Sequence, residues 1–193
     1  MARPLEFNPD EALNQALDIF WKKGYDATSL SDLLDAMKLS KSSFYQSFGN
    51  KHQLYEQCLQ HYRYSISRNM LRDLETAPSA LSFIKKLFSS IAKDVSEDKG
   101  RCGCMIMNSA SAKAPFDEKI GDIVHDGAKQ FEDIFYKAVK RAQAKGDIPK
   151  DKNPKTLARF LVSSRSGLLA MAKAGASKEE LKDIITVTLS VLK

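Results

Sequence analysis

The sequence predicts an all-α protein, and three observations support this fold class. Helix-start signals recur from Asn8-Pro9-Asp10-Glu11 near the N-terminus to Ser177-Lys178-Glu179-Glu180 near the C-terminus. Between these signals, apolar residues repeat every three or four positions, which is the spacing of one buried helix face. No two alternating segments are joined by a hairpin turn. We therefore expect helices separated by Gly and Pro residues.

The first half of the chain predicts four helices. The first begins after Asn8 and ends at Gly24, and the second begins at Ser29, where Asp32 stands three residues later in a capping-box arrangement. After a break near residues 38–39, a short third helix runs from the cap at Ser40 to Gly49, with two phenylalanines on its inner side. A long fourth helix follows and stops before Pro78.

The second half predicts five more helical segments. An amphipathic helix covers residues 81–95, and a short helix lies within residues 100–115. Another covers residues 120–142, and a further one begins at Pro154 and ends at Gly175. The last segment, LKDIITVTLSVL, has Thr and Val residues that favour a strand by propensity. Its cap and its apolar period favour a helix, which is our prediction.

Composition places the chain among ordinary globular proteins. It has 193 residues, of which 43% are hydrophobic and 28% charged. The three cysteines do not predict a disulfide framework, and we find no signal peptide and no apolar run long enough to cross a membrane. We expect a cytoplasmic protein with no membrane association and no cofactor.

The net charge of +6 is unevenly distributed along the chain. Residues 1–55 contain six Lys/Arg and seven Asp/Glu, so the overall excess lies in the remainder of the sequence. Within this neutral region, residues 36–55 contain three lysines and no acidic residue. A general argument from pI for DNA binding is therefore weak, but a local positive window remains.

This window contains the stretch LSKSSFYQSFGNK at residues 39–51. Two short helices joined by a tight turn, apolar inside and polar outside, describe a helix-turn-helix, whose second helix enters the major groove of DNA. Lys41 can reach a guanine edge or a phosphate, and Gln46 can pair with adenine. Lys51 stands at a helix start, where a phosphate is favoured. For any single residue, a merely solvated face is the alternative. The predicted DNA contacts are Thr28, Ser29, Ser40, Lys41, Ser42, Ser43, Tyr45, Gln46 and Lys51.

Residues 24–55 resemble the DNA-binding segment of the TetR family of transcriptional repressors. The matching positions are Gly24, Tyr25, Thr28, Ser29, Ser40, Lys41, Ser43, Phe44, Tyr45, Phe48, Lys51 and Leu54. Lys38 and Ser42 depart from the pattern, because both stand where the family often has Gly. Lys38 must therefore adopt a positive φ, which is uncommon for lysine, or the turn must differ.

The resemblance implies the rest of the architecture and the function. It implies about nine helices, with a DNA-binding domain over residues 7–67 and a regulatory and dimerisation domain over residues 68–193. It further implies a homodimer formed through residues 154–192, where small residues would let helices approach closely. Such a homodimeric repressor binds a palindromic operator in double-stranded DNA and is released by a small-molecule effector. The small residues are Ser163, Ser164, Ser166, Gly167 and Ala170.

The sequence also suggests an effector site and a reactive thiol. An apolar cavity would be lined by Phe88, Met105, Met107, Asn108, Phe131 and Phe135, although aromatic residues at helical spacing also suit a core. Arg101-Cys102-Gly103-Cys104 suggests a thiol that responds to oxidants or electrophiles. Burial of Cys104 as a small apolar residue is the alternative. The histidines stand in no ligand spacing with the cysteines, so we predict no metal site.

Two other function classes were compared with the regulator. An enzyme is disfavoured, because the sequence contains no phosphate loop, no nucleophile elbow and no helix with paired histidines. A helical adaptor that binds protein through residues 75–193, without specific DNA contact, is the remaining alternative.

Overall fold

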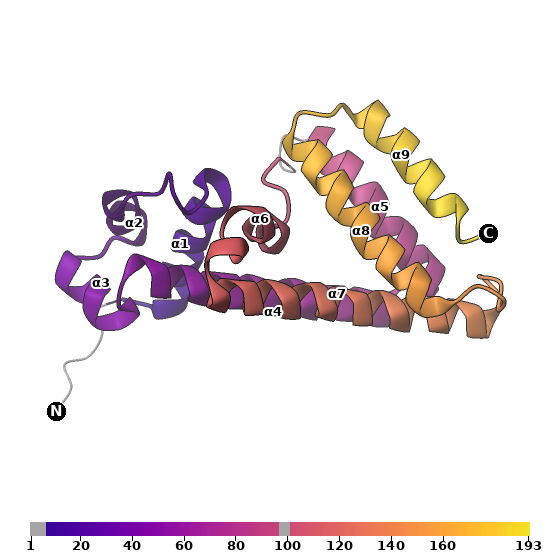
Figure 1. Ribbon diagram of the computed structural model, residues 1–193, viewed down its shortest axis with the longest axis horizontal. Helices are drawn as coiled ribbons and strands as arrows, with labels where there is room; N and C mark the ends of the chain where they lie inside the picture. The colour runs from indigo at the N-terminus through magenta and orange to yellow at the C-terminus, as the bar shows by residue number, and fades with distance from the viewer. Residues whose placement is uncertain (1–6, 97–100) are drawn as a thin grey trace. The chain divides into compact units, whose positions relative to one another are not determined.

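The computed structural model describes residues 7–96 and 101–193, with side chains described up to Val95 in the first range. All regular structure in these residues is helical, in nine α-helices and one short 3₁₀ helix (Figure 1). The predicted all-α fold class is therefore confirmed. The elements are Pro9–Lys23 (α1), Leu30–Met37 (α2), Lys41–Phe48 (α3), Lys51–Thr76 (α4), Ala80–Ser96 (α5), Met105–Ala112 (α6), Ala114–Phe116 (η1), Glu118–Lys145 (α7), Pro154–Lys173 (α8) and Lys178–Ser190 (α9).

The helices begin where the capping residues predicted them. The Asn8 side chain accepts hydrogen bonds from the amides of Asp10 and Glu11 at 3.0 and 3.4 Å. Ser177 and Glu180 form a reciprocal capping box at the start of α9. Because each cap satisfies amides that have no partner within the helix, it marks the first turn locally. The Thr- and Val-rich tail is accordingly a helix, as predicted.

The chain divides into two compact units, one ending at Arg63 and the other running from Tyr64 to Lys193. The predicted division at residues 67–68 falls about one helical turn further along α4. In the first unit, Phe20, Leu33, Phe44 and Leu54 are at most 2% exposed and form the core. In the second unit, α5 lies beside α7, α8 and α9 (Figure 1). No described helix is long and apolar enough to cross a membrane.

Lys38 ends α2 in a left-handed conformation, with φ 54° and ψ 42°. Its N–H donates to the carbonyl oxygen of Leu34, and the Leu39 amide donates to the same oxygen at 3.1 Å. The positive φ was one of the two alternatives predicted for this departure from the family pattern, and the structure confirms it. The turn into α3 is therefore made by a residue with a Cβ in a conformation that favours glycine.

We expect Lys38→Gly to raise the free energy of unfolding by about 0.5–1 kcal/mol. A left-handed conformation costs a non-glycine residue about 1–2 kcal/mol, and the greater freedom of glycine in the unfolded chain returns part of this gain. Urea denaturation followed by circular dichroism measures the change. As a control, Lys22→Gly within α1 should lower the same free energy, by up to about 1 kcal/mol. A loss of stability in Lys38→Gly would contradict the interpretation.

Candidate nucleic-acid interface

Helix α3 has one face in the core and the opposite face open to solvent. Phe44 is fully buried and Phe48 is 5% exposed, with their ring centroids 6.3 Å apart. The exposed face begins at the first helical residue and returns one turn later, as the 3.6-residue period requires. With its inner face packed, the helix presents a polar face free of acidic residues. The exposed residues are Lys41, Ser42, Tyr45 and Gln46.

Both ends of α3 are fixed by local contacts. At the start, the Ser43 amide donates to Ser40 Oγ at 3.1 Å, and the two hydroxyl groups lie 2.9 Å apart. At the end, Gly49 adopts φ 76°, and a Cβ there would collide with the side-chain amide of Gln53. The predicted contacts Ser40 and Ser43 are thus engaged in the cap. Because one of these hydroxyls donates to the other, one O–H group of the pair remains to bond a phosphate oxygen.

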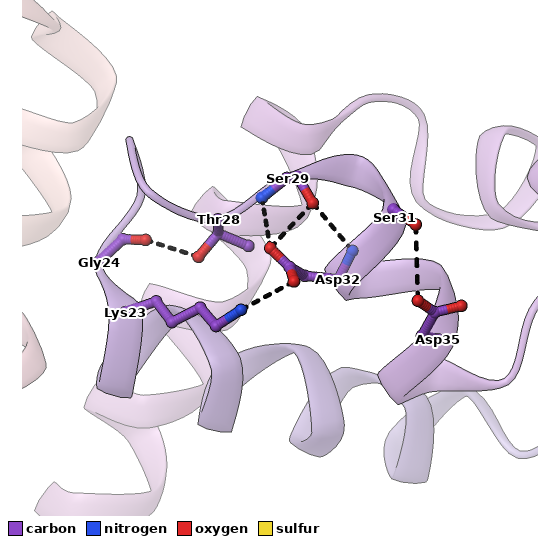
Figure 2. A network of polar contacts seen from close by, with 7 residues as sticks. All are labelled: Lys23, Gly24, Thr28, Ser29, Ser31, Asp32 and Asp35. Carbon is purple, nitrogen blue, oxygen red and sulfur yellow. Dashed lines mark hydrogen bonds and ion pairs between the residues drawn. The ribbon is translucent and has the colours of Figure 1, made fainter.

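Polar contacts join the end of α1 to the start of α2 (Figure 2). Lys23 Nζ lies 2.8 Å from Asp32 Oδ1, and the Ser29 amide donates to Asp32 Oδ2 at 2.8 Å. The Asp32 amide in turn donates to Ser29 Oγ at 3.0 Å. The hydrogen bond from Lys23, followed by those from Ser29, lowers the pKa of Asp32 from 3.8 to about 2. Asp32 is therefore ionised at neutral pH and fixes the first turn of α2.

Thr28 lies inside this connection and does not face solvent. Its hydroxyl donates to the Gly24 carbonyl oxygen at 2.6 Å (Figure 2). The residue is 1% exposed. A buried hydroxyl with an internal partner stabilises the loop between α1 and α2. The geometry therefore does not favour direct contact between Thr28 and a nucleic acid. Ser29 is exposed but already serves the cap of α2.

Lys51 is held at the start of α4 by an aromatic partner that the sequence did not identify. Its Nζ lies 4.4 Å from the centroid of the Tyr25 ring. Tyr25 stacks on Phe20 at 6.0 Å and packs against Tyr55 at 4.9 Å, so the ring itself is fixed. Cation–π contacts at exposed sites contribute about 0.5–1 kcal/mol. Tyr25 therefore restricts where the Lys51 charge can lie, beside the first turn of α4.

Asn50 caps α4 through a reciprocal pair of hydrogen bonds with Gln53. The Gln53 amide donates to Asn50 Oδ1 at 2.9 Å, and the Asn50 amide donates to Gln53 Oε1 at 3.0 Å. The helix N-terminus carries partial positive charge, and Lys51 adds a full one. This end of α4 suits a phosphate group.

The predicted effector residues are largely core residues of the second unit. Phe88, Met105, Phe131 and Phe135 are at most 3% exposed, and the rings of Phe88 and Phe135 are 6.2 Å apart. Asn108, which is partly exposed like Met107, donates through Nδ2 to the Cys102 carbonyl oxygen at 2.8 Å. Four of the six residues thus pack in a core, which was the alternative to a ligand cavity. Asn108 holds the loop before α6.

The three cysteines are free thiols in different surroundings. Cys104 is 3% exposed at the N-cap of α6, whereas Cys102 is partly exposed. Cys58 lies in the core of the first unit, where burial raises its pKa strongly. Among the described residues, no group of three or more His, Cys, Asp or Glu side chains is placed to hold a metal ion. Cys102 is therefore the thiol that solvent can reach.

Helices α8 and α9 expose apolar side chains along one shared groove of about 580 Å³. Phe160 is 41% exposed, Ile184 38% and Val187 70%, and all three line the groove together with Val191. Met171 on α8 is 44% exposed. Large apolar side chains exposed together in this way are typical of interaction surfaces.

Two family models match the chain. Residues 12–58 match the model described as bacterial regulatory proteins, tetR family, and residues 80–188 match the tetracyclin repressor-like C-terminal domain. The first range contains α2, α3 and the start of α4, and the second contains α5 through most of α9.

Individual relatives match over nearly the whole chain. The uncharacterized transcriptional regulator YezE of Bacillus subtilis is 31% identical over 193 residues, covering all of both chains. The transcriptional repressor ComR of Escherichia coli is 30% identical over 189 residues, covering 97% of this chain and 90% of ComR. A cysteine mutant of the regulator CifR, solved in complex with a 26-base-pair operator, superposes with a TM-score of 0.86 at 29% identity over all of both chains. The chain therefore belongs to the TetR family of bacterial regulatory proteins.

Proposed function

We propose that the protein is a homodimeric transcriptional repressor that binds a palindromic operator and leaves it when a small molecule or an electrophile binds. The observation that carries this proposal is the polar, acid-free outer face of α3 above its buried phenylalanines. Its relatives support it, since ComR is named a transcriptional repressor and CifR was solved on operator DNA.

Within the major groove, the exposed residues of α3 divide into two roles. Gln46 and Lys41 have the length and the donors to reach base edges. Ser42 and Tyr45, together with Ser40 and Ser43 at the cap, suit phosphate oxygens. Lys51, held by Tyr25, binds a phosphate at the start of α4. Base contacts give the sequence preference, and the phosphate contacts fix the register on the duplex.

A palindromic operator requires two copies of α3 presented about 34–36 Å apart, or a multiple of that spacing. The exposed apolar groove of α8 and α9 supplies a self-complementary surface for such a dimer. Exposed Gly167 and Ala170 on α8 let a second helix approach closely. A small change in the separation of the two copies of α3 then prevents them from binding both half-sites at once.

The effector acts on the second unit. An apolar ligand would enter among Phe88, Met105, Met107, Asn108, Phe131 and Phe135 by displacing core contacts. An electrophile would instead modify Cys102, the partly exposed thiol in the loop that Asn108 holds.

We expect Gln46→Ala and Lys51→Ala to impair DNA binding in different ways. Sequencing of duplexes selected by the purified protein first identifies the preferred site. Gln46→Ala should weaken that site by about 1–3 kcal/mol and leave binding to random DNA unchanged. Lys51→Ala should weaken both and reduce the slope of log affinity against log salt by about 0.9. Gel shifts at several salt concentrations measure both effects.

Lys140→Ala, at an exposed position on α7, is the matched control and should change neither quantity. If the unmodified protein and every variant bound selected and random duplexes equally, the protein would be a helical adaptor rather than a regulator.

Val187→Glu should dissociate the dimer, because it places a charge in the middle of an apolar interface. Light scattering after size-exclusion chromatography should show a folded monomer with at least tenfold weaker operator binding. Thr186→Glu, one residue away and also exposed, should remain dimeric. If Val187→Glu remained dimeric and bound the operator with unchanged affinity, the dimer interface would lie elsewhere.

Cys102 should be the first thiol to react with N-ethylmaleimide, because Cys58 and Cys104 are buried. Peptide mass spectrometry identifies the modified residue, and gel shifts follow release from the operator. Release should disappear in Cys102→Ser and persist in Cys58→Ser. Release that survives Cys102→Ser would remove the electrophile response from the proposal.

A further inference from the structure

A groove of about 690 Å³ lies between α5 and α9 in the second unit. Its lining includes four lysines, two from each helix, namely Lys86, Lys93, Lys178 and Lys182. Two buried apolar residues, Ala92 and Ile185, also line it. The volume is within the range of about 300–1,000 Å³ that is usual for small-molecule sites. The groove is separate from the apolar groove of Phe160 and Val187, and from the predicted effector residues.

The lysines of α9 oppose the electrostatics of their own helix. Lys178 and Lys182 are four residues apart, so their like charges face each other on one side of α9. Lys178 also occupies the first helical residue, where the helix dipole disfavours a cation. Neither lysine forms an ion pair within the part of the chain that the structure describes. A bound anion would relieve both sources of repulsion.

Lys86 of α5 is only weakly compensated. Lys86 Nζ lies 3.9 Å from Asp73 Oδ2, which is too long for a hydrogen bond. Asp94 is the one carboxylate among the described lining residues. In the described part of the lining, lysines therefore outnumber carboxylates, and an excess of positive charge in a hollow concentrates anions.

Hydroxyl groups complete the lining. Ser89, Ser90 and Thr186 also line the groove, and their hydroxyls donate to carbonyl oxygens of their own helices at 3.2, 3.1 and 2.8 Å. The groove thus combines apolar side chains, hydroxyl groups and ammonium groups. Inorganic ions use only the last of these.

We propose that this groove binds an amphipathic organic anion, an apolar chain that carries a carboxylate or a phosphate monoester. The chain lies over Ala92 and Ile185, and the anionic group lies among the ammonium groups of Lys86, Lys178 and Lys182. This site goes beyond the repressor function, because it involves neither the reading helix nor the dimer groove. Such an anion can come from a free metabolite or from an anionic lipid surface.

Titration calorimetry with octyl phosphate tests the proposal on the full chain. We expect saturable binding of octyl phosphate, weaker binding of inorganic phosphate and no binding of neutral octyl glucoside. Co-sedimentation with phosphatidylglycerol vesicles distinguishes the sources, since pelleting identifies a lipid headgroup and its absence identifies a free anion. The proposal would be overturned if octyl phosphate showed no saturable binding. Binding of an acidic peptide such as octaglutamate without binding of octyl phosphate would overturn it as well.

Two variants locate the site. Lys182→Glu should lower the affinity for octyl phosphate at least tenfold, because the attraction between residue 182 and the phosphate becomes a repulsion. Thr186→Trp should weaken it similarly without changing charge, because the indole fills the groove. Lys140→Glu on α7 makes the same charge change outside the groove and should have less than a twofold effect. Circular dichroism verifies that each variant is folded. Binding that survives both groove variants would also overturn the proposal.

Discussion

The burial of Phe44 and Phe48 is the constraint on which the proposed interface depends. Helix α3 has only two turns and would not be stable alone, so its position is set by the phenylalanines that anchor it to the core of the first unit. Once they are buried, the helical period determines which residues face outward. The serines and lysine on that side are therefore presented as one rigid surface. Rigid presentation reduces the entropy lost when DNA is bound.

Most of the fold could be predicted from the sequence because its signals are local. Asn8, Ser29, Ser40, Asn153 and Ser177 each accept hydrogen bonds from amides two or three residues later, so the boundary is encoded within one turn. The same local logic gave two alternatives at Lys38 but could not choose between them. The cation–π contact between Lys51 and Tyr25 was missed, because it joins residues from separate elements.

The second unit shows where such reasoning ends. Helical spacing predicted that Phe88 and Phe135 face inward, yet a filled core and a ligand cavity produce the same spacing. Only the packing shows that their rings lie 6.2 Å apart. The lysine groove likewise has no sequence signature. Lys86 and Lys182 stand far apart in the chain, and they share a hollow because α5 packs beside α9.

The two proposed sites lie in parts of the chain that differ in net charge. Residues 1–55 carry no net positive charge, so attraction to a duplex must come from a few well-placed groups such as Lys41 and Lys51. The remaining residues carry a net charge of +7, which lies outside helix α3 in the sequence. Part of that excess is concentrated in the four lysines between α5 and α9. A charge that served solubility alone would be dispersed over many faces, whereas here like charges share one hollow. In the proposed site, a bound anion would reduce the repulsion among these like charges.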